Sequence, residues 1–334
     1  MPKVLVTGSA GFIGFHLCKL LLTEGFEVVG FDAMTDYYDV RLKERRQANL
    51  LQSGSFKAVN DRLEADGVLM DLVAEEKPDF IVHLAGQAGV RYSIDEPRSY
   101  VESNIIGTFN LLEAVRATPV KHLLLASTSS AYGANTQMPY AETDKADTQM
   151  SFYAATKKSN EVMAHSYAHL YDIPTTMFRF FTVYGPWGRP DMAPFKFTKA
   201  VLNGDPIDVY NHGDMSRDFT YVTDLVRGIH LLLNAVPERL DEVPAGDSLS
   251  PVAPHRIVNI GNGEPVQLMA FIEAIEKATG KPAEKNFMDI QPGDVPATWA
   301  DCTLLQSLTG YTPKTDIETG VEAFVEWYRD YYDV

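Results

Sequence analysis

The chain has 334 residues, of which 45% are hydrophobic and 22% are charged, and its formal net charge is -16. This length and composition predict a compact globular protein with room for two lobes. The acidic balance excludes a surface for nucleic acid or anionic membranes, both of which require basic patches, and no apolar run approaches the roughly 20 residues that span a bilayer.

The sequence alternates short aliphatic runs with helical patterns. The runs are KVLVTG, EVVGFD, DFIVHLAG, HLLLAST and TTMFRFFTVYG, and between them stand helical segments such as FIGFHLCKLLLTEG and SNIIGTFNLLEAVRA. Strands that are apolar on both faces and separated by helices indicate a parallel sheet between two helical layers. We therefore predict a doubly wound α/β fold of the Rossmann type.

A glycine-rich turn follows the first predicted strand. Gly8, Gly11 and Gly14 form GxxGxxG before an apolar helix, where glycine permits a tight turn and close approach to a pyrophosphate. The helix N-terminus then offers unpaired amides to the phosphates. The turn also contains Phe12 and Ile13, which we expect beside the same nucleotide.

Asp32 ends the second predicted strand. From there its carboxylate can accept hydrogen bonds from the hydroxyls of an adenosine ribose. The same charge repels a 2′-phosphate, so we predict NAD and not NADP as the cofactor. An aspartate that merely ends a strand is the alternative.

The regular alternation of aliphatic runs and helical patterns ends after about Tyr184. The proline-rich segment PWGRPDMAP begins there, and shorter mixed elements follow. We predict an NAD-binding Rossmann domain over residues 1–182, to which the chain returns near 216–234 and 255–262. Residues 183–334 are expected to form a smaller, mixed C-terminal lobe that binds the substrate.

Tyr153 and Lys157 lie four residues apart in SFYAATKKSNEVMA, so they share one face of a predicted helix. A nearby cation stabilises phenolate and lowers a tyrosine pKa, which is near 10 when unperturbed. Tyr153 could then act as a base near neutrality. The spacing alone also fits an ordinary amphipathic surface, and the nucleotide fingerprint favours the chemical interpretation.

Five segments together resemble the extended short-chain dehydrogenase/reductase superfamily over essentially the whole chain: GSAGFIG, HLAGQAGVR, STSSAYG, YAATK and RFFTVYGP. Three longer ones, DAMTDYYDVRLKERR, HLAGQAGVRYS and TVYGPWGRPDMAPFKFTKA, are most similar to the UDP-glucuronate 4-epimerase family. The resemblance implies NAD on the first lobe and a UDP-sugar in the cleft against the second. It leaves the adenine contact around Asp61, Arg62 and Leu63 open.

The resemblance assigns Tyr153 as the base that takes the proton of the sugar C4 hydroxyl while a hydride passes to the nicotinamide. It implies that Lys157 also binds the nicotinamide ribose and that Thr128 bridges substrate and tyrosine. Hydroxyls that only cap the backbone are the alternative for Thr128. Further cofactor contacts are expected at two strand ends, from Leu84, Ala85, Gly86 and Ser127.

Ser129 and Ser130 discriminate between reactions that follow oxidation. Related dehydratases carry an Asp-Glu pair just after the catalytic threonine, because elimination of water needs an acid and a base, and related decarboxylases carry a glutamate nearby. This chain has serines at those positions. A 4-keto intermediate should therefore be reduced again on its other face, which inverts C4.

The substrate's carboxylate must also be held. A 4-keto-glucuronate is a β-keto acid and loses carbon dioxide readily if its carboxylate aligns with the carbonyl π system. Arg189 in GPWGRPD can make a bidentate contact, with a surface arginine as the alternative. The expected hydroxyl partners of the carboxylate are Thr128, Ser129, Ser130 and Thr182.

Four more residues complete the predicted substrate site. Arg217 in GDMSRDFTYV matches the family arginine that binds the UDP diphosphate, and Asp294 in QPGDV resembles a position that contacts the ribose. Val209 belongs to the strand expected beside uracil. Arg91 in AGVRYS either reaches the substrate or fixes its own loop, and the sequence leaves both open.

We predict NAD-dependent interconversion of UDP-glucuronate and UDP-galacturonate. A UDP-glucose 4-epimerase, a UDP-glucuronate decarboxylase and a non-catalytic NAD-sensing protein are the alternatives. The resemblance implies a homodimer through the helices 97–117 and 152–171.

No metal is predicted, since Cys18 and Cys302 stand far apart without a Cys/His cluster. A strand that begins at Lys3 leaves no room for a signal peptide, which together with the few cysteines favours the cytoplasm.

Overall fold

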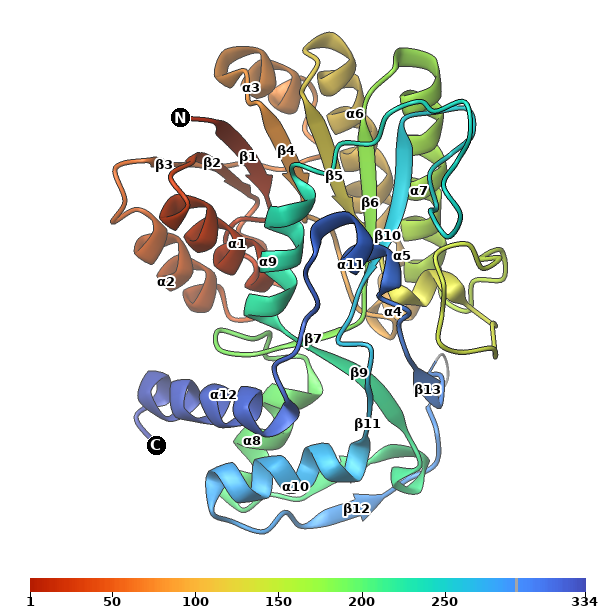
Figure 1. Ribbon diagram of the computed structural model, residues 1–334. Helices are drawn as coiled ribbons and strands as arrows, with labels where there is room; N and C mark the ends of the chain where they lie inside the picture. Colours follow the sequence, from red (N-terminus) through yellow and green to blue (C-terminus); the bar gives the residue numbers. More distant parts are fainter. Residues whose placement is uncertain (292–293) are drawn as a thin grey trace.

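The computed structural model describes residues 1–291 and 294–334. Its centre is a seven-stranded sheet in the order β10-β6-β5-β4-β1-β2-β3, and all its pairings are parallel (Figure 1). The strands are β1 (Lys3–Thr7), β2 (Glu27–Asp32), β3 (Phe56–Asn60), β4 (Phe80–His83), β5 (His122–Ala126), β6 (Thr175–Phe180) and β10 (His255–Ile260). This confirms the predicted doubly wound α/β fold.

Helices cover both faces of this sheet. One face packs against α1 (Phe12–Thr23), α2 (Val40–Leu50), α9 (Val222–Leu232) and α11 (Thr303–Thr309), and the other against α3 (Val68–Glu76), α6 (Gly107–Ala117) and α7 (Phe152–Tyr171). Along β1, Val4 and Val6 enter the first core and Leu5 enters the second. Burial on both sides explains why these strands read as continuous apolar runs.

Short elements connect the sheet to the helices around it. The chain after β4 passes through α4 (Tyr92–Asp95), α5 (Pro97–Tyr100) and a π-helical turn, η1 (Val101–Ile106), before α6. A 3-10 turn, η2 (Ser129–Tyr132), follows β5.

Successive strands are added first on one side of β1 and then on the other. The chain builds β2 and β3 on one side of β1 and β4, β5 and β6 on the other. Connections therefore diverge at the carboxyl ends of β1 and β4, and this switch point is where doubly wound sheets bind ligands. The glycine-rich turn and Asp32 both lie at that edge.

The second lobe lies below the sheet in Figure 1. Its elements are β7 (Thr182–Tyr184), α8 (Ala193–Asn203), β8 (Ile207–Val209), η3 (Tyr210–Gly213), β9 (Ser216–Tyr221), β11 (Pro265–Gln267), α10 (Leu268–Thr279), β12 (Lys285–Phe287), β13 (Ala297–Thr298) and α12 (Ile317–Tyr332). The strand β9 pairs with β7, β11 and β13, while β8 pairs with β12.

The chain passes between the lobes more than once. Both α9 and β10 belong to the first lobe and fall within the segments 216–234 and 255–262. The helix α11 packs on the same core, a return that the sequence analysis does not include. The division of the chain at residue 182 stays a prediction.

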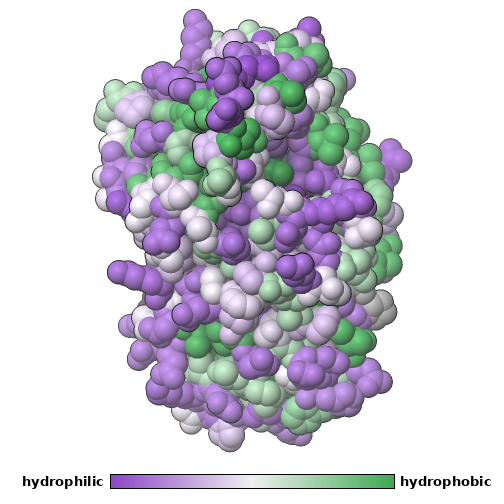
Figure 2. Space-filling model, turned by 45° about the vertical axis from the view of Figure 1, so that its right-hand side comes forward, coloured by the Kyte–Doolittle hydropathy of each residue, from purple (hydrophilic) through white to green (hydrophobic). Residues whose placement is uncertain are grey.

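Polar side chains cover most of the face seen in Figure 2, and apolar ones form separate patches among them. Within residues 1–291 and 294–334, every helix falls short of the length or apolar character that crossing a membrane requires. The same residues contain no group of three or more His, Cys, Asp or Glu side chains arranged to hold a metal ion.

The core of the second lobe is aromatic. Phe271 of α10 is fully buried and stacks on Phe219 of β9, with ring centroids 4.5 Å apart and an interplanar angle of 16°. We expect Phe271→Ala to lower the free energy of unfolding by about 3–5 kcal/mol, because it removes buried area and leaves a cavity. Urea unfolding measures this.

Phe287→Ala is the matched control, because Phe287 lies in the same lobe with half of its surface exposed. It should change the free energy of unfolding by about 0.5 kcal/mol or less. Equal losses in the two variants would contradict the assignment of Phe271 to the core.

Candidate active site

A cavity of about 510 Å³ opens at the carboxyl edge of the sheet and extends to the second lobe. Its wall contains nearly all of the residues predicted from the sequence: Gly8, Gly11, Phe12, Ile13, Gly14, Asp32, Leu84, Ala85, Gly86, Ser127, Thr128, Ser129, Ser130, Tyr153, Lys157, Thr182, Arg189, Arg217 and Asp294. Arg91 and Val209 are not part of this wall. The fold thus brings the cofactor-binding candidates and most of the substrate-binding candidates to one cavity.

The glycine-rich turn is packed too closely for side chains. Gly8 has φ +74, and a Cβ there would stand 2.8 Å from the backbone nitrogen of Ala85. A Cβ on Gly11 would stand 2.9 Å from the carbonyl oxygen of Gly8, and one on Gly14 would overlap that oxygen. The bare turn leaves the N-terminus of α1 open to the cavity, which fits the pyrophosphate of a dinucleotide.

Asp32 is a fixed acceptor beside this turn. Its Oδ2 accepts from the backbone amide of Ala10 at 3.0 Å and its Oδ1 from that of Met34 at 2.9 Å. Each oxygen keeps a further lone pair, and the residue lines the cavity. This geometry fits the predicted contact with ribose hydroxyls.

The far end of the cavity is lined by Arg62, Leu63 and Glu64. Asp61 is exposed and lies outside that wall, and its carboxylate accepts from the backbone amide of Arg62 at 2.7 Å. Of the three positions left open for the adenine contact, Arg62 and Leu63 are therefore the ones at the cavity.

Tyr153 and Lys157 project into the cavity from the first turns of α7. The helix begins after Ser151, whose Oγ accepts from the amide of Ala154 at 3.1 Å as an N-cap. A Cβ on Gly86, at the end of β4, would stand 3.7 Å from the ammonium nitrogen of Lys157. The ammonium group thus lies on the side where the cofactor is expected.

The pKa of Tyr153 differs from the sequence-based expectation. Burial raises it above 10, while the Thr128 hydroxyl and the charge of Arg189 act in the opposite direction. Burial also lowers the pKa of Lys157 to about 8, against the charge of Glu161. The chain alone therefore does not lower this pKa, because desolvation of the phenolate outweighs the hydrogen bond with Thr128 and the charge of Arg189.

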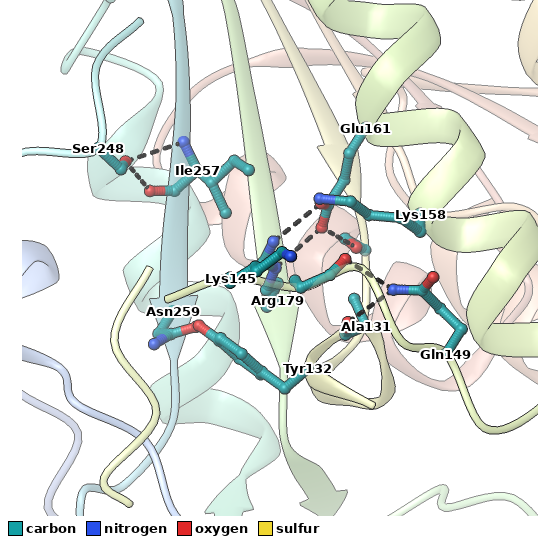
Figure 3. A network of polar contacts seen from close by, with 12 residues as sticks. Ala131, Tyr132, Lys145, Gln149, Lys158, Glu161, Arg179, Ser248, Ile257 and Asn259 are labelled. Carbon is teal, nitrogen blue, oxygen red and sulfur yellow. Dashed lines mark hydrogen bonds and ion pairs between the residues drawn. The ribbon is translucent and has the colours of Figure 1, made fainter. Parts of the chain in front are cut away.

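A buried ion pair supports the catalytic helix from behind. Figure 3 shows Glu161 of α7 facing Arg179 of β6, whose Nε and Nη2 each donate to the carboxylate at 2.9 Å. Both side chains are at most 2% exposed. The Ser127 hydroxyl donates to the same carboxylate at 2.6 Å, which joins the end of β5 to α7.

A second chain of hydrogen bonds beside this pair leads to the half-buried Glu142. The Tyr132 hydroxyl donates to Asn259 Oδ1 at 2.7 Å (Figure 3), and the amide of Asn259 donates to Glu142 Oε1 at 2.8 Å. Burial raises the pKa of Glu142 to about 7, with Asp301 adding to the rise. This carboxyl group therefore ionises near neutrality in the folded protein.

The segment after β5 offers hydroxyl groups to the cavity. Thr128 Oγ1 accepts from the amide of Ser130 at 3.2 Å and caps η2, so it caps the backbone and lines the cavity at once. Among the described residues of the wall, the carboxylates belong to Asp32, Glu64 and Asp294. None of them belongs to the segment 127–130.

Arg189 already has a partner. Its Nε donates to Asp191 Oδ1 at 3.0 Å and its Nη2 to Oδ2 at 2.6 Å. The Tyr37 hydroxyl donates to the same Oδ2 at 3.3 Å. The pairing with Asp191 raises the pKa of Arg189 against the effect of burial, so the guanidinium stays charged and its orientation is fixed.

Of the other substrate candidates, Arg217 and Asp294 line the cavity, and Arg91 and Val209 do not. Arg217 is held by backbone carbonyls, with Nη2 donating to Val295 at 2.7 Å and Nη1 to Ser216 at 2.8 Å. Arg91 donates to Asp294 Oδ2 at 2.9 Å. Val209 has 0% exposure and lies in the core of the second lobe, so its side chain does not reach the cavity.

Asn104 was not predicted from the sequence to belong to the site. This buried side chain lies on η1, and its Oδ1 accepts from the amide of Gln87 at 2.8 Å while its Nδ2 donates to Thr156 Oγ1 at 3.0 Å. It thereby ties the loop after β4 to α7. A polar residue on the apolar face of SNIIGTFNLLEAVRA was the available signal.

Comparison with known proteins agrees with this geometry. The family profile described as GDP-mannose 4,6 dehydratase matches residues 5–324. A probable UDP-glucuronate 4-epimerase of Rhizobium meliloti (strain 1021) is 57% identical over 334 residues, covering 99% of this chain and 98% of the relative. UDP-glucuronate 4-epimerase 1 of Arabidopsis thaliana is 44% identical, covering 99% of this chain and 77% of the relative.

A solved structure is also similar along the whole chain. The UDP-glucuronic acid 4-epimerase of Bacillus cereus, in complex with UDP-glucuronic acid and NAD, superposes with a TM-score of 0.88 at 33% identity. The match covers 99% of this chain and 100% of that one.

The raised pKa of the half-buried Glu142 predicts a pH dependence of stability. The pKa of Glu142 is about 7 in the folded protein and near 4.5 without burial, so the folded state binds the proton more tightly. Stability from this group is complete below pH 4.5 and is lost as the pH rises through 7. Glu142→Gln keeps the acceptor for Asn259 and cannot ionise.

The variant should therefore gain stability relative to the wild type between pH 5 and 8, as measured by urea unfolding. Glu242→Gln, on an exposed loop, serves as the control and should show no such trend. A pH-independent difference between Glu142→Gln and the wild type would refute the raised pKa.

Proposed function

Since the chain belongs to the GDP-mannose 4,6-dehydratase-like family of extended short-chain dehydrogenases/reductases, we propose that it is an NAD-dependent UDP-glucuronate 4-epimerase. It interconverts UDP-glucuronate and UDP-galacturonate. One observation carries the proposal: Tyr153 and Arg189 line one cavity, whose segment 127–130 provides hydroxyls and no carboxylate. The names of the Rhizobium, Arabidopsis and Bacillus proteins support the same reaction.

Tyr153 acts as the base. Its phenolate takes the proton of the sugar C4 hydroxyl, and the Thr128 hydroxyl lies close enough to stabilise the ionised phenol by lowering its pKa. The chemistry that bound NAD would supply is reversible hydride transfer at C4. The residues that would hold this cofactor are Gly8, Gly11, Phe12, Ile13, Gly14, Asp32, Leu84, Ala85, Gly86, Ser127, Tyr153 and Lys157.

The same phenol completes the reaction. Elimination of water would need an acid and a base beside the keto sugar, and Ser129 and Ser130 offer neither at neutral pH. The keto sugar therefore keeps its atoms until Tyr153 returns the proton to the C4 oxygen. Reduction on the opposite face inverts the configuration at C4.

The uronate carboxylate is held by hydroxyls and one cation. Thr128, Ser129, Ser130 and Thr182 provide donors from two strand ends on the cavity wall. Arg189 contributes the charge, and its pairing with Asp191 fixes the plane of the guanidinium. Restraint from both sides keeps the carboxylate away from alignment with the C4 carbonyl.

The nucleotide part of the substrate binds at the second lobe. Arg217, with its carbonyl-bound guanidinium directed into the wall, is proposed to bind the diphosphate. Asp294 and Arg91 form an ion pair across the mouth of the cavity, and we assign them to the ribose and phosphate. Any contribution of Val209 comes through the backbone of β8, because its side chain is buried.

We also propose that the protein works as a homodimer in the cytoplasm. Two helices on the same face of the sheet, α6 and α7, expose large apolar side chains, namely Phe109, Val162 and Leu170. Exposed apolar residues on adjacent helices are typical of a subunit interface. Both cysteines are free, which suits a reducing compartment.

Product analysis tests the reaction directly. We expect purified protein to convert UDP-glucuronate to UDP-galacturonate. NMR, with and without added NAD, measures the product. Tyr153→Phe should lower the rate by about 10²-fold or more, the range expected for removal of a general base. Tyr167→Phe, on the same helix with its hydroxyl bonded to Glu113, is the matched control and should retain activity.

Two outcomes would exclude the proposal. Formation of mainly carbon dioxide and a UDP-pentose would identify a decarboxylase. Conversion of UDP-glucose without conversion of UDP-glucuronate would identify a neutral-sugar epimerase.

The dimer is tested by light scattering after size-exclusion chromatography. Phe109→Glu and Val162→Glu should shift the mass from two chains to one, because each places a charge in the proposed interface. Leu51→Glu changes an exposed apolar residue at the end of α2, on the other face of the sheet, and should leave the mass unchanged. A wild type with the mass of one chain would refute the dimer.

A further inference from the structure

The segment 33–46 contains the loop between β2 and α2 and the first part of α2. Apart from the bond from Tyr37 to Asp191, it has not yet been given a role in the site. Two of its side chains, Tyr37 and Arg46, reach across the cavity edge to the loop 185–192. That loop carries Arg189.

Arg46 bonds to both sides of the site. Its guanidinium is 0% exposed; Nη1 donates to the carbonyl of Ala10 at 3.0 Å and to the Tyr38 hydroxyl at 2.8 Å. Its Nη2 donates to the carbonyl of Trp187 at 2.5 Å. One rigid group thus joins the glycine-rich turn to the Arg189 loop.

Arg46 is held by hydrogen bonds to neutral oxygen atoms. Within the described part of the chain, Arg46 forms no ion pair, and its partners are carbonyl and hydroxyl oxygens. A planar guanidinium with several such acceptors fixes their relative positions, which a lysine with one ammonium point charge cannot do.

The loop is strained where Arg46 holds it. Trp187 has φ +61, a left-handed conformation that residues other than glycine rarely adopt. Its ring packs against Phe15 and Trp327 at centroid distances of 5.3 and 5.5 Å. Such a conformation persists only where neighbouring contacts impose it.

Tyr37 acts further along the same loop. Its hydroxyl donates to Asp191 Oδ2 at 3.3 Å, and its ring lies 5.7 Å from the guanidinium carbon of Arg189. Asp191 is the bidentate partner of Arg189. The segment therefore touches both members of the pair that is proposed to face the substrate's carboxylate.

We propose that Tyr37 and Arg46 are positioning residues, which set the loop 185–192 and thereby the direction of the Arg189 guanidinium. The inference rests on the proposed function, because its consequence is the fate of a 4-keto-uronate. If the carboxylate swings into alignment, the bond from C5 to the carboxyl carbon breaks. Its electron pair forms an enolate with the C4 carbonyl, carbon dioxide leaves, and C5 then takes a proton.

The test is the product ratio, measured by NMR as decarboxylated sugar nucleotide against UDP-galacturonate. Arg46→Lys should raise this ratio about tenfold, since a displacement of about 1 Å has effects up to 10²-fold. Tyr37→Phe removes a single hydroxyl and should raise it by less. His16 still donates to the carbonyl of Pro186 at 2.8 Å, which keeps the loop attached in both variants.

Arg256→Lys is the matched control. Arg256 is also nearly buried, pairs with Asp247 and reaches the carbonyl of Ala235. Its replacement should lower the melting temperature without changing the product ratio. If Arg46 had a purely structural role, Arg46→Lys would also leave the product ratio unchanged. It would then lower only the stability and the turnover of the protein.

The inference is overturned if Arg46→Lys and Tyr37→Phe are folded and active with the wild-type ratio. If Arg46→Lys does not fold, the ratio of Tyr37→Phe decides alone. A wild type that forms no UDP-galacturonate refutes the proposed function and this inference with it. Wild-type epimerisation with unchanged ratios in the variants refutes only the inference.

Discussion

The site depends on the ion pair between Glu161 and Arg179. Burial of two charges is costly, and the loss of one partner from such a pair costs about 3–5 kcal/mol because the other charge stays buried. The pair fixes the register of α7 on β6, and Glu161 stands one helical turn after Lys157. Through Ser127, the same carboxylate also positions the strand end that carries Thr128. The same ion pair therefore positions Tyr153, Lys157 and Thr128.

The ion pair also influences the protonation of Lys157 in the site. Glu161 is the group that opposes the desolvation of Lys157, whose pKa nevertheless falls to about 8. Burial keeps Tyr153 protonated in the chain alone. A cationic ligand beside the phenol would shift the balance toward phenolate, so the chain's own residues bring Tyr153 only part of the way to a base. That dependence links proton removal to the presence of the predicted cofactor.

Local patterns made much of this site predictable. The glycine turn, Asp32 and the pair Tyr153 and Lys157 each lie within one strand, turn or helix, so spacing alone places their side chains. Asn104 was missed because its partners come from the loop after β4 and from α7. Val209 was assigned to the site although the packing of the second lobe buries its side chain. The raised pKa of Tyr153 in the chain alone could not be predicted for a similar reason, since burial is a property of the assembled fold.

The contact of Arg46 with Trp187 spans 141 positions of the chain, and no short-range pattern encodes it. Its effect is nevertheless chemical. A uronate epimerase must oxidise C4 beside a carboxylate that leaves readily once it aligns with the new carbonyl. Hydroxyls at the end of β5 cannot hold that group from both sides, so the opposite restraint has to come from the second lobe. A buried arginine that clamps a strained loop onto the nucleotide-binding turn keeps this restraint in place throughout the reaction.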